Sequence, residues 1–256
     1  MTISVTVADL SKSYGTHPAL KRLSFTAAPG SIYGLIGPNG AGKTTTLSIL
    51  AGLVSPTSGS VSILGKDAAP NRRDLVSKIG FSSPQLSFFD YLTGAEVILT
   101  CAFMHGIGGQ EAERRLEDLV ELLDLEQASG SYIHQYSHGM RQKLGLACAL
   151  VHAPEVLLLD EPFIGLDPTA VFRISRTLGQ MSSKGGTVLL TSHDLALVER
   201  LCDRVGILHE GVLKREIDLP KAAGSTARCG AGMESGLESA LWEVVGTPIF
   251  RELSWL

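Results

Sequence analysis

The stretch Gly37-Pro-Asn-Gly-Ala-Gly-Lys-Thr44 decides the fold of this chain. It matches the pattern Gly-x-x-x-x-Gly-Lys-Ser/Thr at every fixed position. The residues before it, 31–37, form an apolar run that indicates a buried strand, and residues 44–50 after it indicate a helix. A strand, a glycine-rich loop and a helix in this order predict one unit of a parallel α/β sheet.

Each part of this loop suits the binding of phosphate groups. Gly40 and Gly42 let successive backbone N–H groups curl around an anion, and the following helix points its positive end at the same place. Lys43 would reach the β- and γ-phosphates, and the Thr44 hydroxyl would be a ligand of Mg²⁺. The candidate nucleotide-binding residues are Gly37, Pro38, Asn39, Gly40, Ala41, Gly42, Lys43, Thr44 and Thr45.

A second motif, Leu157-Leu-Leu-Asp-Glu161, supplies two acidic side chains. An acid at the carboxyl end of a parallel strand lies at the edge of the sheet where ligands bind. Asp160 is therefore a candidate metal ligand, and Glu161 would polarise a water molecule for attack on the γ-phosphate. An alternative is that the pair only caps the next turn.

Composition narrows the class of protein. The chain has 256 residues, of which 44% are hydrophobic and 19% are charged, and its net charge is −4. These values exclude a disordered chain, and the acidic balance argues against a dedicated nucleic-acid partner. No apolar run approaches the 18–20 residues of a membrane span, and the first ten residues lack the features of a signal peptide. We therefore expect a cytoplasmic protein.

The four cysteines and several histidines carry no metal pattern. Cys101, Cys148, Cys202 and Cys229 are scattered without a Cys-x-x-Cys pair, so we expect reduced thiols rather than a disulfide or a metal site. His134, His138 and His152 likewise show no metal-binding spacing.

Hydrophobic periodicity predicts the remaining elements. Strands are expected at the N-terminus around Val5 and Val7, in the stretch from Leu23 to the turn at Pro29-Gly30, and at 156–159 and 187–191. Helices are expected at 110–125 and 139–153, from the Asp167-Pro168 cap to Met181, and around Val198; residues 205–215 indicate a hairpin. Residues 221–240, rich in Gly, Ala and Ser, indicate a linker, after which 241–256 could dock back.

Five further features occur in a fixed order: Tyr14; Gln85 in Ser-Ser-Pro-Gln; Tyr136-Ser-His-Gly-Met140; Gly165-Leu-Asp-Pro168; and His193. Together with the glycine-rich loop and the two acids, they resemble the nucleotide-binding subunit of an ABC transporter, over about residues 3–217. Taken alone, each would fit an ordinary structural role, such as a half-buried tyrosine or a histidine that caps a strand. Their order is what carries the resemblance.

The resemblance implies the fold and the domains. It implies an α/β phosphate-loop NTPase core with a mostly parallel sheet, an N-terminal antiparallel β region and an inserted helical subdomain. The ATPase domain would cover residues 1–220, with the helical subdomain at about 86–153 and a C-terminal linker or tail at 221–256.

The resemblance also implies roles for individual residues, with ATP and Mg²⁺ as the cofactors. Tyr14 would stack on adenine, and His193 would contact the γ-phosphate as a catalytic group beside Glu161. Gln85 would be both a catalytic residue and a metal ligand, and would link the metal site to the helical subdomain. Ser137 and Gly139 would bind the γ-phosphate from a second subunit.

The segment 136–140 departs from the family's common Leu-Ser-Gly-Gly-Gln form. His138 stands at a position usually occupied by glycine, and Met140 at one usually occupied by glutamine. The serine hydroxyl at 137 and the unhindered N–H at Gly139 remain at a helix N-terminus, where they can meet a phosphate. This variant resembles the exporter branch of the family.

The expected function follows from the resemblance. The chain would pair head-to-tail with a second ATPase subunit on binding ATP, and would power export through an integral membrane permease subunit on the cytoplasmic face of the membrane. Phe88, Phe89 and Tyr91 are candidates for the docking surface, although they could equally be packed locally. The alternatives are a non-transport ABC-type ATPase that acts as a regulatory or mechanical switch, and a small kinase.

Overall fold

A six-stranded sheet forms the centre of the molecule. The structure is a computed structural model that describes residues 4–219 and 236–246. The strands lie in the order β10-β9-β3-β8-β7-β6, and neighbours pair in parallel except β10 with β9. Their bounds are β3 Ile32–Ile36, β6 Ile79–Ser82, β7 Val156–Leu159, β8 Thr187–Thr191, β9 Arg204–His209 and β10 Val212–Asp218. The predicted mostly parallel α/β sheet is confirmed.

The inner strands are apolar because both of their faces are covered. Every residue of β3, β7 and β8 is buried, and the predicted bounds of β7 and β8 are confirmed. Continuous apolar runs are typical of strands in parallel sheets with covered faces. The carboxyl ends of these three strands consequently lie side by side, at Ile36, Leu159 and Thr191.

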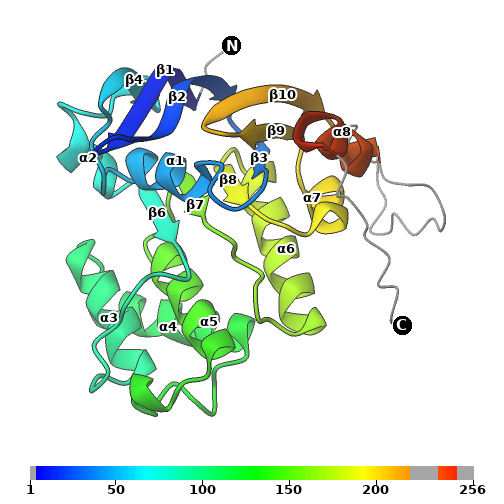
Figure 1. The fold of residues 1–256 in the computed structure, drawn as a ribbon. Helices are drawn as coiled ribbons and strands as arrows, with labels where there is room; N and C mark the ends of the chain where they lie inside the picture. The colour runs from blue at the N-terminus through cyan, green and yellow to red at the C-terminus, as the bar shows by residue number, and fades with distance from the viewer. Residues whose placement is uncertain (1–3, 220–235, 247–256) are drawn as a thin grey trace, which may run out of the picture.

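A smaller antiparallel sheet lies beside the central one (Figure 1). Its order is β2-β1-β4-β5, with bounds β1 Val5–Tyr14, β2 His17–Ala27, β4 Ser58–Ile63 and β5 Lys66–Asp67. The two sheets share a hydrophobic core in which the rings of Phe25 and Tyr33 stack, with 5.0 Å between their centroids. The predicted N-terminal antiparallel region is confirmed.

The helices divide into groups. Helix α1 (Lys43–Leu50) follows β3 directly, and α2 (Arg72–Val76) precedes β6. Helices α3 (Gly94–Met104), α4 (Gly109–Leu123) and α5 (His138–Leu150) pack together below the sheet, and α5 also packs against β6 (Figure 1). Helices α6 (Pro168–Ser183) and α7 (Leu195–Leu201) lie further to the right than α4 and α5 in the view of Figure 1.

Asp167 and Pro168 begin α6 as predicted. The Asp167 carboxylate accepts the backbone N–H of Ala170 at 2.9 Å, and proline occupies the first turn, where a missing N–H costs nothing. Helices α4 and α5 each begin one residue before their predicted starts. Helix α4 ends two residues before its predicted end, and α5 ends three residues before.

The prediction of a linker through Ala240 is wrong for its last residues. Helix α8 (Gly236–Val245) begins inside that segment, and its residues Leu237 and Ala240 are buried. Their spacing continues through Leu241 and Val244, so one face of the helix packs against α7 and β9. The expectations for Cys229, the linker residues 221–235 and the end of the tail at 247–256 lie outside the described residues.

Within the described ranges, no helix combines the length and the hydropathy that a membrane crossing requires.

A glycine on β6 controls how closely helix α5 approaches the sheet. A Cβ atom on Gly80 would clash with the carbonyl oxygen of Ala149 and lie 2.8 Å from the Leu157 side chain. We expect Gly80→Ala to lower the free energy of unfolding by about 1–3 kcal/mol through overpacking, measured by urea denaturation. Gly179→Ala on α6 is the matched control, because its Cβ would meet nothing within 4 Å. It should raise stability by about 0.5–1 kcal/mol, and equal losses in both variants would contradict this account of the packing.

Candidate functional site

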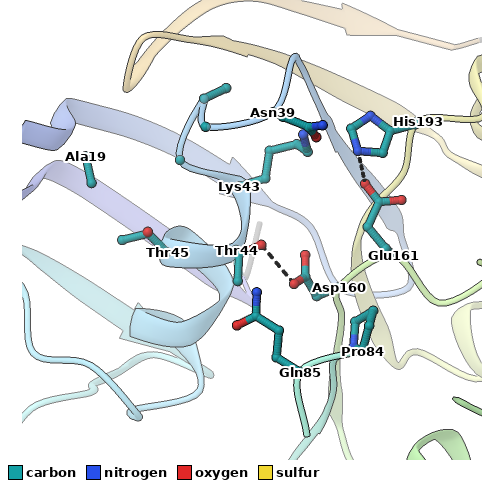
Figure 2. A pocket seen from close by; sticks show the side chains of 13 residues that line it. Ala19, Asn39, Lys43, Thr44, Thr45, Pro84, Gln85, Asp160, Glu161 and His193 are labelled. Carbon is teal, nitrogen blue, oxygen red and sulfur yellow. Dashed lines mark hydrogen bonds and ion pairs between the residues drawn. The ribbon is translucent and has the colours of Figure 1, made fainter. Parts of the chain in front are cut away.

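A cavity of about 270 Å³ opens at the carboxyl ends of the inner strands, next to the start of α1. Figure 2 shows its lining, in which most of the predicted site residues come together. The lining residues are Ala19, Asn39, Gly40, Ala41, Gly42, Lys43, Thr44, Thr45, Pro84, Gln85, Asp160, Glu161 and His193. Seven of the nine loop residues, Gln85, both acids and His193 are therefore placed in one cavity.

The glycine-rich loop has a backbone that only glycine adopts readily. Gly42 has φ +109°, and a Cβ atom there would lie 2.6 Å from the Leu20 side chain and 2.7 Å from the Ala19 carbonyl oxygen. Gly40 has φ +77° and faces open space. The loop thus curls tightly over β2 while its other side stays open as a cradle for an anion.

Lys43 is the cation of the cradle. Its side chain is buried, and Nζ donates to the carbonyl oxygens of Gly37 at 2.7 Å and Pro38 at 3.1 Å. Gly37 and Pro38, which do not line the cavity, therefore hold the ammonium group in place. Burial lowers the pKa of Lys43, and the nearby carboxylates of Glu161 and Asp160 oppose this.

Asp160 is a buried carboxylate that three hydroxyl groups satisfy. Its Oδ2 accepts from Thr44 at 2.9 Å and from Ser83 at 3.2 Å, and its Oδ1 accepts from Thr191 at 2.8 Å. A buried charge needs such partners, because without them its desolvation would be costly. These bonds join the starts of α1 and of the 83–85 loop to the end of β8. Sequence reasoning missed Ser83 and Thr191, which have no motif spacing of their own.

The donor set beside Asp160 fits magnesium. Thr44 and Asp160 place a hydroxyl and a carboxylate oxygen 2.9 Å apart, and Gln85 lines the same cavity. Across residues 4–219 and 236–246, no cluster of three His, Cys, Asp or Glu side chains could hold a metal ion. Mg²⁺ needs no such cluster, since it commonly takes one or two protein ligands and completes its shell with phosphates and water.

Glu161 has a strained backbone. Its φ is +47°, a left-handed conformation that costs a non-glycine residue about 1–3 kcal/mol. The Thr191 hydroxyl accepts its backbone N–H at 2.9 Å. Strain of this kind persists only where the surroundings fix it, and it orients the Glu161 carboxylate toward His193 (Figure 2).

Glu161 and His193 form the polar end of the cavity. Nε2 of His193 lies 2.8 Å from Oε1 of Glu161. Burial raises the pKa of Glu161, which Lys43 opposes and Asp160 reinforces. Burial and the nearby Lys43 ammonium group lower the pKa of His193, which favours the neutral imidazole. A carboxylate of raised pKa is a stronger base toward water than an ordinary one.

Besides Gly37 and Pro38, three predicted residues do not line this cavity. Tyr14 lies at the end of β1 with half of its side chain exposed, and the Lys12 ammonium group lies 5.0 Å from the centre of its ring. Ser137 caps helix α5 by accepting the Met140 N–H at 3.2 Å, and Gly139 follows in the first turn. Within one chain, the segment 136–140 therefore lies outside this cavity.

The fold and the cavity define a phosphate-loop nucleoside triphosphatase. A family model described as "ABC transporter" matches residues 20–164, more than half of the chain. The bacitracin transport ATP-binding protein BcrA of Bacillus licheniformis is 37% identical over 218 residues, which cover 85% of this chain and 70% of that protein. The Nod factor export ATP-binding protein I of Rhizobium meliloti (strain 1021) is 37% identical over 211 residues, covering 82% and 63%.

A solved structure agrees with these relatives. It is the dimeric post-hydrolysis state of an ATP-binding cassette bound to ADP and Pi, with a TM-score of 0.79 and 28% identity, covering 85% of this chain and all of that one. The chain belongs to the ABC transporter family, as the motif order predicted. It is an ATPase of that family's ATP-binding type.

The Thr191 hydroxyl provides a direct test of how the two acids are held. We expect Thr191→Val, which keeps the shape of the side chain, to lose about 1–3 kcal/mol in urea unfolding, because a donor to Asp160 and an acceptor for Glu161 N–H disappear. Thr191→Ser keeps the hydroxyl and loses only a methyl group, so its loss should be smaller. Equal losses in the two variants would show that packing, not hydrogen bonding, is what Thr191 contributes.

Proposed function

We propose that this chain is the ATP-hydrolysing subunit of an exporter, which closes head-to-tail on a second ATPase subunit around ATP and drives a separate membrane subunit. The observation that carries the proposal is the separation within one chain of two halves of a phosphate site. The cavity holds the cradle and the acids, whereas Ser137 and Gly139 present a helix N-terminus elsewhere. Two chains related head-to-tail would bring the halves together.

In the proposed site the loop residues 37–45 bind the phosphates of ATP, and Tyr14 stacks on its base. The exposed ring of Tyr14 is available for such stacking. Lys43 offsets phosphate charge, and the oxygens of Thr44, Asp160 and Gln85 hold Mg²⁺. When bound, the metal ion offsets the charge that develops on the β- and γ-phosphates.

Glu161 is the proposed general base. Its raised pKa suits the removal of a proton from water, and the neutral His193 imidazole can donate a hydrogen bond to the γ-phosphate. Gln85 completes the proposed catalytic set from the loop that follows β6. Hydrolysis would remove the charge that the two chains share, and the dimer would open as a ligand-driven two-state switch.

Export through a membrane permease is the proposed use of this cycle. The names of the two relatives mention bacitracin transport and Nod factor export, and the variant segment 136–140 resembles exporters. Phe89 and Tyr91 are more than four-fifths exposed and suit a docking surface for the permease, whereas Phe88 is partly buried and packs against the core. The chain would then be cytoplasmic and peripheral at the membrane.

The proposed domain division follows the same reasoning. Residues 1–220 would form the ATPase unit, with the helical subdomain at about 86–153 and a tail at 221–256. Helices α3, α4 and α5 fall inside that subdomain and carry the segment that would meet the partner's ATP.

Replacing the proposed base should separate hydrolysis from dimer formation. We expect Glu161→Gln to abolish ATP turnover while ATP binding persists, because the amide cannot accept a proton from water. The uncleaved ATP should hold two chains together, which size-exclusion chromatography with light scattering in ATP will detect. A species that remains a single chain in ATP would contradict the composite site.

Removing the cradle's cation should act on binding itself. We expect Lys43→Ala to weaken ATP binding on the order of tenfold to hundredfold, as for the loss of a charged hydrogen bond, measured by isothermal titration. Lys184→Ala is the control, since that lysine lies after α6 and away from the cavity. An unchanged affinity in Lys43→Ala would remove the loop from the proposed phosphate site.

A further inference from the structure

Helix α5 is attached along its first two turns to the loop that carries Glu161. A Cβ atom on Gly139 would lie 2.6 Å from the Gly165 carbonyl oxygen, so this glycine permits direct backbone contact. One turn further on, Nζ of Lys143 lies 3.7 Å from the Asp167 carboxylate. Helix α5, which begins within segment 136–140, therefore lies along residues 161–167 of the same chain.

Gln142 is the point at which this attachment reaches Glu161. Its side chain is 4% exposed, and Nε2 donates to the backbone carbonyl oxygen of Glu161 at 3.2 Å. The same oxygen is 3.4 Å from the N–H of Ile164, a longer contact that closes the turn. A buried amide with its N–H aimed at a strained peptide is well placed to hold that peptide in one conformation.

The backbone of Glu161 is held from both sides. Thr191 on β8 accepts its N–H, and Gln142 on α5 donates to its carbonyl oxygen. A left-handed φ of +47° is disfavoured for glutamate, so the residue would relax if one of these partners were lost. Relaxation would turn the carboxylate away from His193.

We propose that Gln142 is a positioning residue, which fixes the Glu161 peptide so that its carboxylate stays in the nucleotide cavity, and which joins that carboxylate to the helix bearing Ser137 and Gly139. The inference rests on the proposed function, because it matters to catalysis only if Glu161 acts as the base. In the proposed dimer, Gln142 connects one composite site to the other. The N-terminus of α5 meets the partner's ATP, while Gln142 of the same helix orients the base of its own site.

The test removes the amide donor and keeps the fold. We expect Gln142→Met, which is similar in length and apolar, to lower kcat of the isolated chain's ATPase about tenfold, equal to about 1.4 kcal/mol, with KM and ATP affinity unchanged. Gln142→Asn keeps an amide that is one methylene too short to reach Glu161, and should lose kcat similarly. Arg141→Met is the matched control, because Arg141 on the same helix pairs with Asp90 instead, 3.3 Å away, and kcat should not change.

The split between kcat and KM distinguishes positioning from loss of structure. A merely structural role would lower the thermal stability and the ATP affinity of Gln142→Met together with kcat, whereas a positioning role lowers kcat alone.

Two results would overturn the inference, and they are distinguishable. Wild-type kcat in Gln142→Met or Gln142→Asn, with Glu161→Gln inactive in the same assay, would remove the role of Gln142 and leave the proposed base intact. Full turnover by Glu161→Gln would instead remove the base, and the inference with it.

Discussion

The hydrogen bonds of the buried Asp160 carboxylate are the interactions on which the rest of the site depends. This carboxylate lies at the end of β7 and accepts hydroxyl hydrogens from Thr44, Ser83 and Thr191. These three residues belong to the start of α1, the segment after β6 and the end of β8. One desolvated charge thus fixes the relative positions of the glycine-rich loop, the loop of Gln85 and the strand beside Glu161, since leaving it without partners would cost several kcal/mol.

Two further hydrogen bonds hold the backbone of the neighbouring residue, Glu161. Thr191 accepts the Glu161 N–H as well as donating to Asp160, so the conformation of the proposed base is tied to the metal-binding oxygen. On the other side, Gln142 links Glu161 to helix α5. Packed, hydrogen-bonded groups therefore connect the cradle to the N-terminus of α5, where His138 and Met140 replace the family's common residues. His138 lies against Gly165, which has φ +74° and tolerates the contact because it lacks a side chain.

The parts of the structure that the sequence predicted are those with strong local signals. Strands β7 and β8 were predictable because continuous apolar runs bounded by polar residues mark strands covered on both faces. Strands β4 and β6 were missed, because the sequence of Ser58–Ile63 is mostly polar and Ile79–Ser82 is only four residues long. Helix α8 was missed in part, because its buried residues Leu237 and Ala240 sit in a segment whose overall composition is that of a linker. The glycine-rich loop and the two acids were predictable from spacing. Ser83, Thr191 and Gln142 were not, because each acts on a residue far away in the chain, from 19 to 77 positions distant.

The central claim is that the hydrolytic unit is two chains, with ATP held between the cradle of one and helix α5 of the other. The most direct measurement is ATP turnover per chain as a function of chain concentration at saturating ATP, with light scattering on the same samples. The account predicts that turnover per chain rises with concentration and levels off as two-chain particles replace single chains, as mass action requires. Constant turnover per chain across a range in which scattering finds only single chains would contradict it.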